Sequence, residues 1–74
     1  MPYVNIKVTK EGGPDGNGPS ANQQAALIAG VSALLQDVLG KDPSSTFVVI
    51  DQIPVESWGI GGLPVLDYRQ QAQS

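Results

Sequence analysis

Apolar and polar residues alternate over positions 3–9 of the chain. One set of alternate positions holds only β-branched apolar residues, namely Val4, Ile6 and Val8. The other set is mainly polar and consists of Tyr3, Asn5, Lys7 and Thr9. A period of two residues is typical of a strand with one face buried and the other exposed. We therefore expect a β-strand over residues 3–9.

A long helix is predicted after a glycine-rich loop. The loop covers residues 10–19, and its four glycines and two prolines indicate a flexible, irregular segment. Ser20 and Gln23 have the spacing of a capping box. Apolar residues then recur every three or four positions, at Leu27, Ile28, Val31, Leu34, Leu35 and Val38. Gly40, followed by Pro43, is expected to end the helix.

Residues 46–53 predict a second strand, which is apolar at both alternating sets in its middle. A strand, a helix and a strand form a βαβ unit, in which the crossover is right-handed and the strands lie parallel. One helix covers only one face of a sheet, and a two-stranded sheet is marginal alone. We therefore expect an α+β fold in which two chains pair into a larger sheet.

The C-terminal part of the sequence predicts little regular structure. The only tryptophan, Trp58, lies beside three glycines within residues 56–62, which favours a tight turn or a short hairpin. Residues 63–69 have no clear period, and residues 70–74 are polar enough to fray. No repeat or second domain is visible, so residues 1–74 are expected to form one domain.

Size and charge narrow the possible functions. A chain of 74 residues forms a small core, and the absence of Cys and His removes disulfides and the usual soft metal ligands. Oligomerisation is the expected support, with no cofactor and no metal. A net charge of −3 without a basic run argues against nucleic acid as a partner. The apolar runs are too short to span a membrane, and no signal peptide is visible, so we expect a cytoplasmic protein.

Pro2 is the residue with the most distinctive chemistry. A small residue at position two allows Met1 to be removed, which leaves a free secondary amine on Pro2. An ordinary α-amino group has a pKa near 7.7–8.0, so the nitrogen must be desolvated, or placed near cations, to act as a base at neutral pH. Tyr3, Trp58 and Ile60 are candidate apolar walls, and Lys7 or Lys10 is a candidate cation.

These features together resemble the 4-oxalocrotonate tautomerase family of the tautomerase superfamily. The resemblance rests on residues 1–8, the single amphipathic helix, the strand at 47–50 and the Trp-Gly-Ile-Gly-Gly segment at 58–62. It implies a β-α-β unit with parallel strands and a short C-terminal hairpin, assembled through dimers into a hexamer. It also implies a cofactor-independent keto-enol tautomerase, in which Pro2 is the general base for a small enol or 2-hydroxydienoate acid.

The sequence departs from the family at positions that contact substrate carboxylates. Two arginines of the family correspond here to the region of Gly12 and Gly13 and to Phe47. Lys10 is our candidate for the missing carboxylate contact, with Arg69 as a weaker one, and Trp58 and Ile60 are expected to line the pocket. Two alternatives stay open: a catalytically weak or non-catalytic member of an oligomer, and a hydratase or dehalogenase of small unsaturated acids in which Pro2 acts as an acid.

Overall fold

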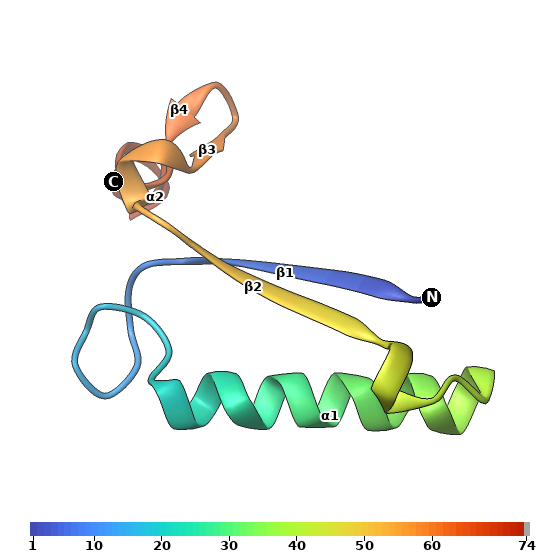
Figure 1. Cartoon of the computed structure of the whole chain (residues 1–74). Coiled ribbons are helices and arrows are strands. Elements are labelled where there is room, and N and C mark those ends of the chain that lie inside the picture. The colour runs from blue at the N-terminus through green and yellow to red at the C-terminus, as the bar shows by residue number, and fades with distance from the viewer. Residues whose placement is uncertain (74) are drawn as a thin grey trace.

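The computed structural model describes residues 1–73 and contains the predicted βαβ unit (Figure 1). Strand β1 spans Tyr3–Thr9, helix α1 spans Ala21–Leu39 and strand β2 spans Phe47–Ile53. The two strands are parallel, and their register runs from Tyr3 opposite Phe47 to Thr9 opposite Ile53. The fold class expected from the sequence is confirmed, with β2 beginning one residue later than predicted.

Helix α1 begins and ends where the capping residues indicate. The Ser20 hydroxyl accepts a hydrogen bond from the Gln23 amide, while the Gln23 side chain accepts one from the Ser20 amide. Gly40 takes the left-handed conformation with φ of 67°, and its amide donates to the carbonyl of Gln36. These bonds satisfy backbone groups that a helix otherwise leaves without partners at its ends.

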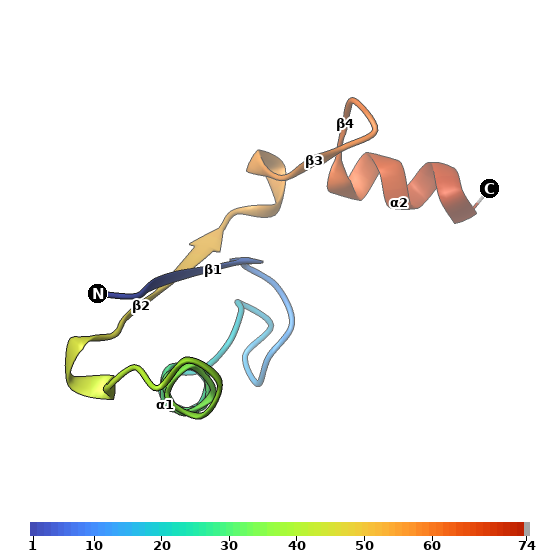
Figure 2. The same ribbon diagram turned by 90° about the vertical axis from the view of Figure 1, so that its right-hand side faces the viewer.

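Helix α1 lies against one face of the two strands and leaves the other face uncovered (Figure 2). The alternation seen in the sequence explains the arrangement, because Val8 and Leu27 line the space between β1 and α1. On the uncovered face, 65% of Tyr3 and 53% of Phe47 remain exposed. Two large aromatic side chains next to each other on an open sheet face are typical of a surface that contacts another protein chain.

A short hairpin follows β2, as the sequence predicts. A single 3-10 turn at Val55–Ser57 leads into strand β3, Gly59–Ile60, which pairs antiparallel with β4, Leu63–Pro64. The two residues between these strands, Gly61 and Gly62, have φ of 63° and 82°. Positive φ at both central positions is the requirement of a tight type I′ hairpin turn, which glycine meets without strain.

Helix α2, Val65–Gln73, was not predicted. Residues 63–69 have no clear period and residues 70–74 were expected to fray, whereas the helix continues to Gln73. Ser74 lies outside the described residues. The helix is short and mostly polar, so it has no long apolar stripe that a sequence pattern would reveal. The helix is supported by local packing, since its first residue, Val65, is only 7% exposed. Pro64 directly before it is compatible with a helix start, because the first turn of a helix tolerates proline.

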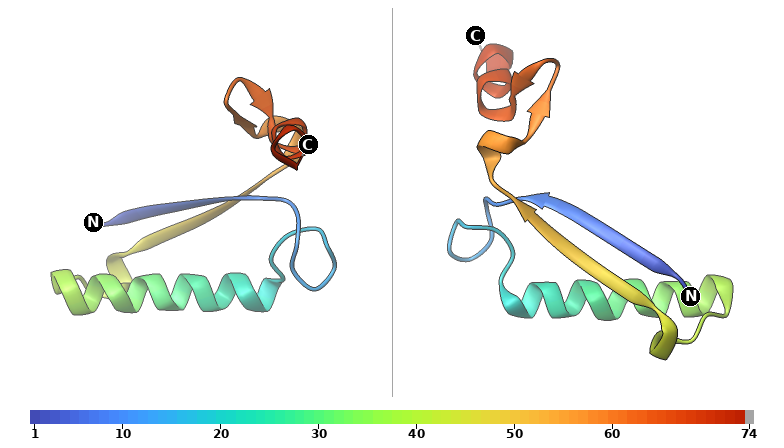
Figure 3. Two further views of the ribbon diagram at one scale, coloured as in Figure 1. Left: turned by 180° about the vertical axis from the view of Figure 1, so that it is seen from behind. Right: turned by 45° about the horizontal axis from the view of Figure 1, so that its top comes forward.

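The single chain is more extended than a compact domain of its length. Its radius of gyration is 15.6 Å, whereas a compact chain of 74 residues is expected at roughly 11 Å. The accessible surface is 5180 Å², compared with roughly 4,300 Å² for a compact protein of this mass. The hairpin and α2 stand away from the βαβ unit (Figure 3). Among the described residues, no helix is long and apolar enough to cross a membrane.

Candidate active site

Pro2 lies at the beginning of the sheet and is half-buried. The Phe47 amide donates a hydrogen bond of 2.9 Å to the Pro2 carbonyl oxygen, which extends the ladder between β1 and β2 by one step. Met1, before it, is 85% exposed. While Met1 is attached, the Pro2 nitrogen is an amide. Removal of Met1 converts it into an amine at a position that the sheet already holds.

The other predicted site residues lie at the opposite end of the strands. The Lys10 amide donates to the carbonyl of Ile53 at 2.7 Å, so Lys10 follows the last residue pair of the sheet. Trp58 directly precedes β3, and Ile60 belongs to it. Strand β3 lies beyond the same end of β2 (Figure 1). Seven residues of strand separate this end from Pro2, a distance of roughly 23 Å. A single chain therefore brings Lys10, Trp58 and Ile60 to one end and leaves Pro2 at the other.

Lys7 is paired and is not a free cation for the Pro2 nitrogen. Its ammonium group lies 2.8 Å from the Asp51 carboxylate on β2, and Asn5 donates to the same carboxylate oxygen at 2.8 Å. The hydrogen bond to Asp51 raises the pKa of Lys7. The hydrogen bonds from Lys7 and Asn5 lower the pKa of Asp51. The charge of Lys7 is compensated in the middle of the uncovered sheet face. Its suggested role in lowering the pKa of Pro2 has no support in this geometry.

Arg69 is also committed to a partner within the chain. Its guanidinium donates to both carboxylate oxygens of Glu11, at 2.8 and 2.9 Å, and the Thr9 hydroxyl donates to Glu11 as well. The hydrogen bonds from Arg69 and Thr9 lower the pKa of Glu11 from 4.5 to about 2. Glu11 was not among the predicted site residues, because its partner is 58 positions away along the chain and no local pattern joins them. Lys10 is exposed, and no side-chain partner of it is found within residues 1–73.

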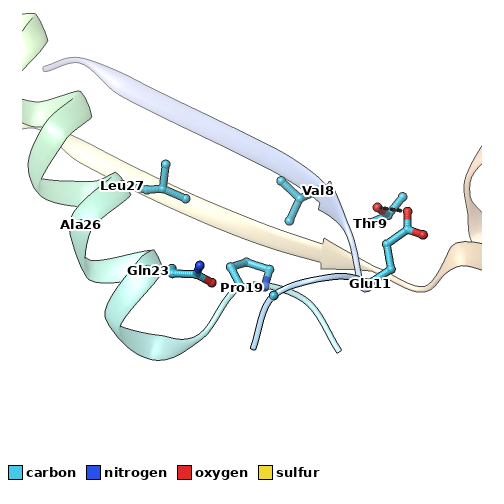
Figure 4. A pocket seen from close by; sticks show the side chains of 8 residues that line it. Val8, Thr9, Glu11, Pro19, Gln23, Ala26 and Leu27 are labelled. Carbon is cyan, nitrogen blue, oxygen red and sulfur yellow. Dashed lines mark hydrogen bonds between the residues drawn. The ribbon is translucent and has the colours of Figure 1, made fainter. Parts of the chain in front are cut away.

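An open pocket lies beside the end of β1 that carries Lys10. Its volume is about 590 Å³, and its lining is mostly apolar. Figure 4 shows Val8 and Leu27 pointing into it from the strand and the helix, with the Glu11 carboxylate near its rim. Within the described residues, no three acidic, His or Cys side chains gather in a way that would hold a metal ion.

Comparisons with known proteins connect this arrangement to one family. The family model described as tautomerase enzyme matches residues 2–68. A probable tautomerase K2 from Dickeya dadantii strain 3937 is 50% identical over 72 residues, which is 97% of this chain and 98% of that protein. The crystal structure of DmpI from Helicobacter pylori is 40% identical, with a TM-score of 0.80 over 93% of this chain and 97% of that chain.

A more distant structure shares only the fold. A heterohexamer 4-oxalocrotonate tautomerase from Chloroflexus aurantiacus J-10-fl shares the fold, with a TM-score of 0.74 at 21% identity over 90% of this chain and 97% of that chain. Its subunits therefore act as part of a six-chain assembly.

Proposed function

This chain belongs to the tautomerase family and is an isomerase, and from that premise we propose that it interconverts the enol and keto forms of a small unsaturated acid without a cofactor. The substrate class that we propose is a small enol or a 2-hydroxydienoate. Pro2, after removal of Met1, is the general base. Trp58 and Ile60 form the apolar wall of the site, and Lys10 contacts the substrate carboxylate.

The observation that carries this proposal is the separation of Pro2 from the other site residues within one chain. A site that contains Pro2, Lys10 and Trp58 must take Pro2 from one protomer and the other two from a second protomer. Strand β1 has a free edge on the side away from β2 in the described chain, and free edges readily pair with another strand. Assembly then completes the site.

A two-fold axis supplies the required pairing. If β1 pairs antiparallel with β1 of a second copy over its whole length, the axis passes by its central residue, Ile6. Tyr3 then lies opposite Thr9 of the second copy, and Pro2 lies opposite Lys10. The same pairing places Pro2 beside the pocket at the end of the partner strand. The uncovered sheet faces remain for contacts between such dimers, and we propose a homohexamer.

The chemistry follows from what surrounds Pro2 in such a site. Trp58 and Ile60 exclude water from the amine, and desolvation favours its neutral form. Each unit by which the pKa falls corresponds to about 1.4 kcal/mol of differential interaction between the charged and neutral amine. A neutral amine takes a proton from one position of the bound enol and returns it to a carbon further along the conjugated chain. Lys10 compensates the substrate carboxylate during this transfer.

Mixed oligomers test whether the site is shared between protomers. Pro2→Ala and Trp58→Ala homo-oligomers each lose most activity on a small 2-hydroxydienoate. When the two variants are unfolded, mixed in equal amounts and refolded together, about a quarter of the sites combine an intact Pro2 with an intact Trp58 from the other chain. Activity should therefore return to about a quarter of the wild-type value. Recovery to no more than the mean of the two variants contradicts a shared site.

A further inference from the structure

The Glu11 and Arg69 side chains connect the two parts of the fold. Glu11 follows β1 in the βαβ unit, and Arg69 lies on α2 in the C-terminal part. We propose that Glu11 is a positioning residue, which holds α2 through Arg69 and thereby sets the place of the Trp58 and Ile60 wall. The proposal rests on the function proposed above, because it assigns a role to the same wall.

The elements of the C-terminal part are joined to one another by a hydrogen bond and by packing. The Val65 amide, at the start of α2, donates a hydrogen bond of 2.8 Å to the Trp58 carbonyl. Tyr68 packs over the hairpin turn so closely that a Cβ on Gly61 would lie 3.3 Å from its ring. Val65 is buried between helix and hairpin. A displacement of α2 therefore carries the backbone of Trp58 with it.

Apart from the Glu11–Arg69 pair, α2 packs mainly on its own hairpin and little on the sheet. Helix α2 packs against the turn at Val55–Ser57 and against β3 and β4, all of which belong to the same C-terminal part. The polypeptide leaves β2 through Pro54 and turns away from the βαβ unit (Figure 3). The bidentate ion pair between Glu11 and Arg69 is a second attachment of the C-terminal part to the βαβ unit, in addition to the backbone at Pro54. Two attachments restrict the orientation of the C-terminal part more than one does.

The backbone at Glu11 is held by hydrogen bonds at the end of the sheet. The Glu11 amide donates to the Thr9 carbonyl at 2.9 Å, and the adjacent Lys10 amide donates to Ile53 at 2.7 Å, so the backbone at this point belongs to the sheet. The Thr9 hydroxyl orients the carboxylate. Exposed ion pairs contribute little on average, and bidentate arginine geometry is the exception in which they hold a defined position.

The test uses the fluorescence of Trp58, which is the only tryptophan in the chain. Glu11→Gln keeps the size of the side chain and removes its charge. We expect its Trp58 emission to shift to longer wavelength and kcat/KM to fall by about two- to fivefold, which corresponds to the interaction of an exposed pair. The loss should lie mainly in KM, because the displaced wall no longer packs against the bound substrate.

Two further variants make the test specific. Asp15→Asn removes the same charge from the same loop without touching Arg69, and it should leave both emission and KM as in the wild type. The reversed pair, Glu11→Arg with Arg69→Glu, restores a salt bridge at the same place and should recover most of the emission and of KM. Wild-type emission in Glu11→Gln, or no recovery in the reversed pair, overturns the proposal. The emission is read without substrate, so this outcome is separate from any failure of the tautomerase assignment.

Discussion

The Phe47 amide donates a 2.9 Å hydrogen bond to the Pro2 carbonyl oxygen, and this bond fixes Pro2 to the start of β2. Proline has no amide hydrogen to contribute to a sheet. The sheet therefore uses only the carbonyl of Pro2 and leaves its nitrogen outside the ladder. If Met1 is removed, as we propose, the sheet holds Pro2 by its carbonyl and leaves the amine free to react.

Replacement of the base is the first prediction. Pro2→Ala keeps the carbonyl that accepts from Phe47, so the oligomer should form as before. We expect kcat/KM on a 2-hydroxydienoate to fall by about 100-fold or more, the range of a lost general base. Size-exclusion chromatography monitors assembly, and intact-mass measurement verifies that Met1 is removed in both proteins. Turnover equal to the wild type would rule out Pro2 as the base.

The pH dependence of the rate distinguishes a base from an acid. If Pro2 acts as a base, kcat/KM rises as the amine loses its proton and reaches a plateau at higher pH. If Pro2 acts as an acid, as in hydration or dehalogenation of an unsaturated acid, the rate falls over the same range. A form that retains Met1, made in cells with methionine aminopeptidase inhibited, has an amide at this position and should be inactive at every pH. Activity in that form contradicts both roles.

The parts of the fold that local sequence specifies were predicted, and those that depend on distant contacts were not. The alternation over β1 and the capping residues Ser20 and Gln23 act within a few positions, so their elements were placed correctly. Helix α2 was missed because its support comes from packing of residues such as Tyr68 on the hairpin. The pairing of Glu11 with Arg69 joins residues too far apart for any motif.

The placement of the candidate site was only partly accessible to sequence reasoning. The pattern indicated Pro2, Lys10, Trp58 and Ile60 as residue types suited to the chemistry, and their roles stay a proposal. The same pattern already implied parallel strands, in which the beginning of β1 and the end of β2 lie at opposite ends of the sheet. That separation makes assembly a condition of the proposed activity.

The ionisation of Glu11 predicts an acid-dependent loss of stability. Its pKa is lowered from 4.5 to about 2 by hydrogen bonds from Arg69 and Thr9. Because the pKa of Glu11 is lower in the folded state, its carboxylate stabilises the fold at a pH above 4.5, the pKa of the unfolded state. This contribution to stability disappears as the pH falls from 4.5 towards 2. Wild type should therefore exceed Glu11→Gln in denaturant midpoint near neutral pH, and the two midpoints should converge below pH 4.5. A constant difference would show that the carboxylate does not carry the effect.

The proposed pairing of β1 strands predicts a specific cross-link. The chain has no cysteine, so Ile6→Cys introduces a single thiol at the proposed two-fold axis. Residues opposite each other in an antiparallel pair have Cα atoms about 4.5–5.5 Å apart, which lies within the range that a disulfide bridges. Oxidised Ile6→Cys should migrate as a covalent dimer on a non-reducing gel. Val4→Cys lies on the same face but opposite Val8 of the second copy, so it should stay monomeric; the reverse result would exclude this register.

Gly12 and Gly13, in the loop between Lys10 and α1, allow a test of how tightly this loop is packed. Gly12 and Gly13 have almost equal φ, 69° and 71°, so alanine at either position meets the same left-handed backbone cost, about 1–2 kcal/mol. Only their surroundings differ. A Cβ on Gly12 meets no atom within 4 Å, whereas a Cβ on Gly13 would lie 2.1 Å from the carbonyl oxygen of Gly18.

This difference makes Gly12→Ala the matched control for Gly13→Ala. Gly18 donates from its amide to the Gly12 carbonyl at 3.0 Å, so the two sides of the loop are joined where the clash would occur. We expect Gly12→Ala to lower the free energy of unfolding by about 1–2 kcal/mol and Gly13→Ala by about 3 kcal/mol or more. Urea unfolding at equal protein concentration measures both, since the stability of an oligomer depends on concentration. Equal losses of stability would mean that the loop moves to accommodate the added methyl group. The close approach of Gly13 to Gly18 would then not be required for the fold.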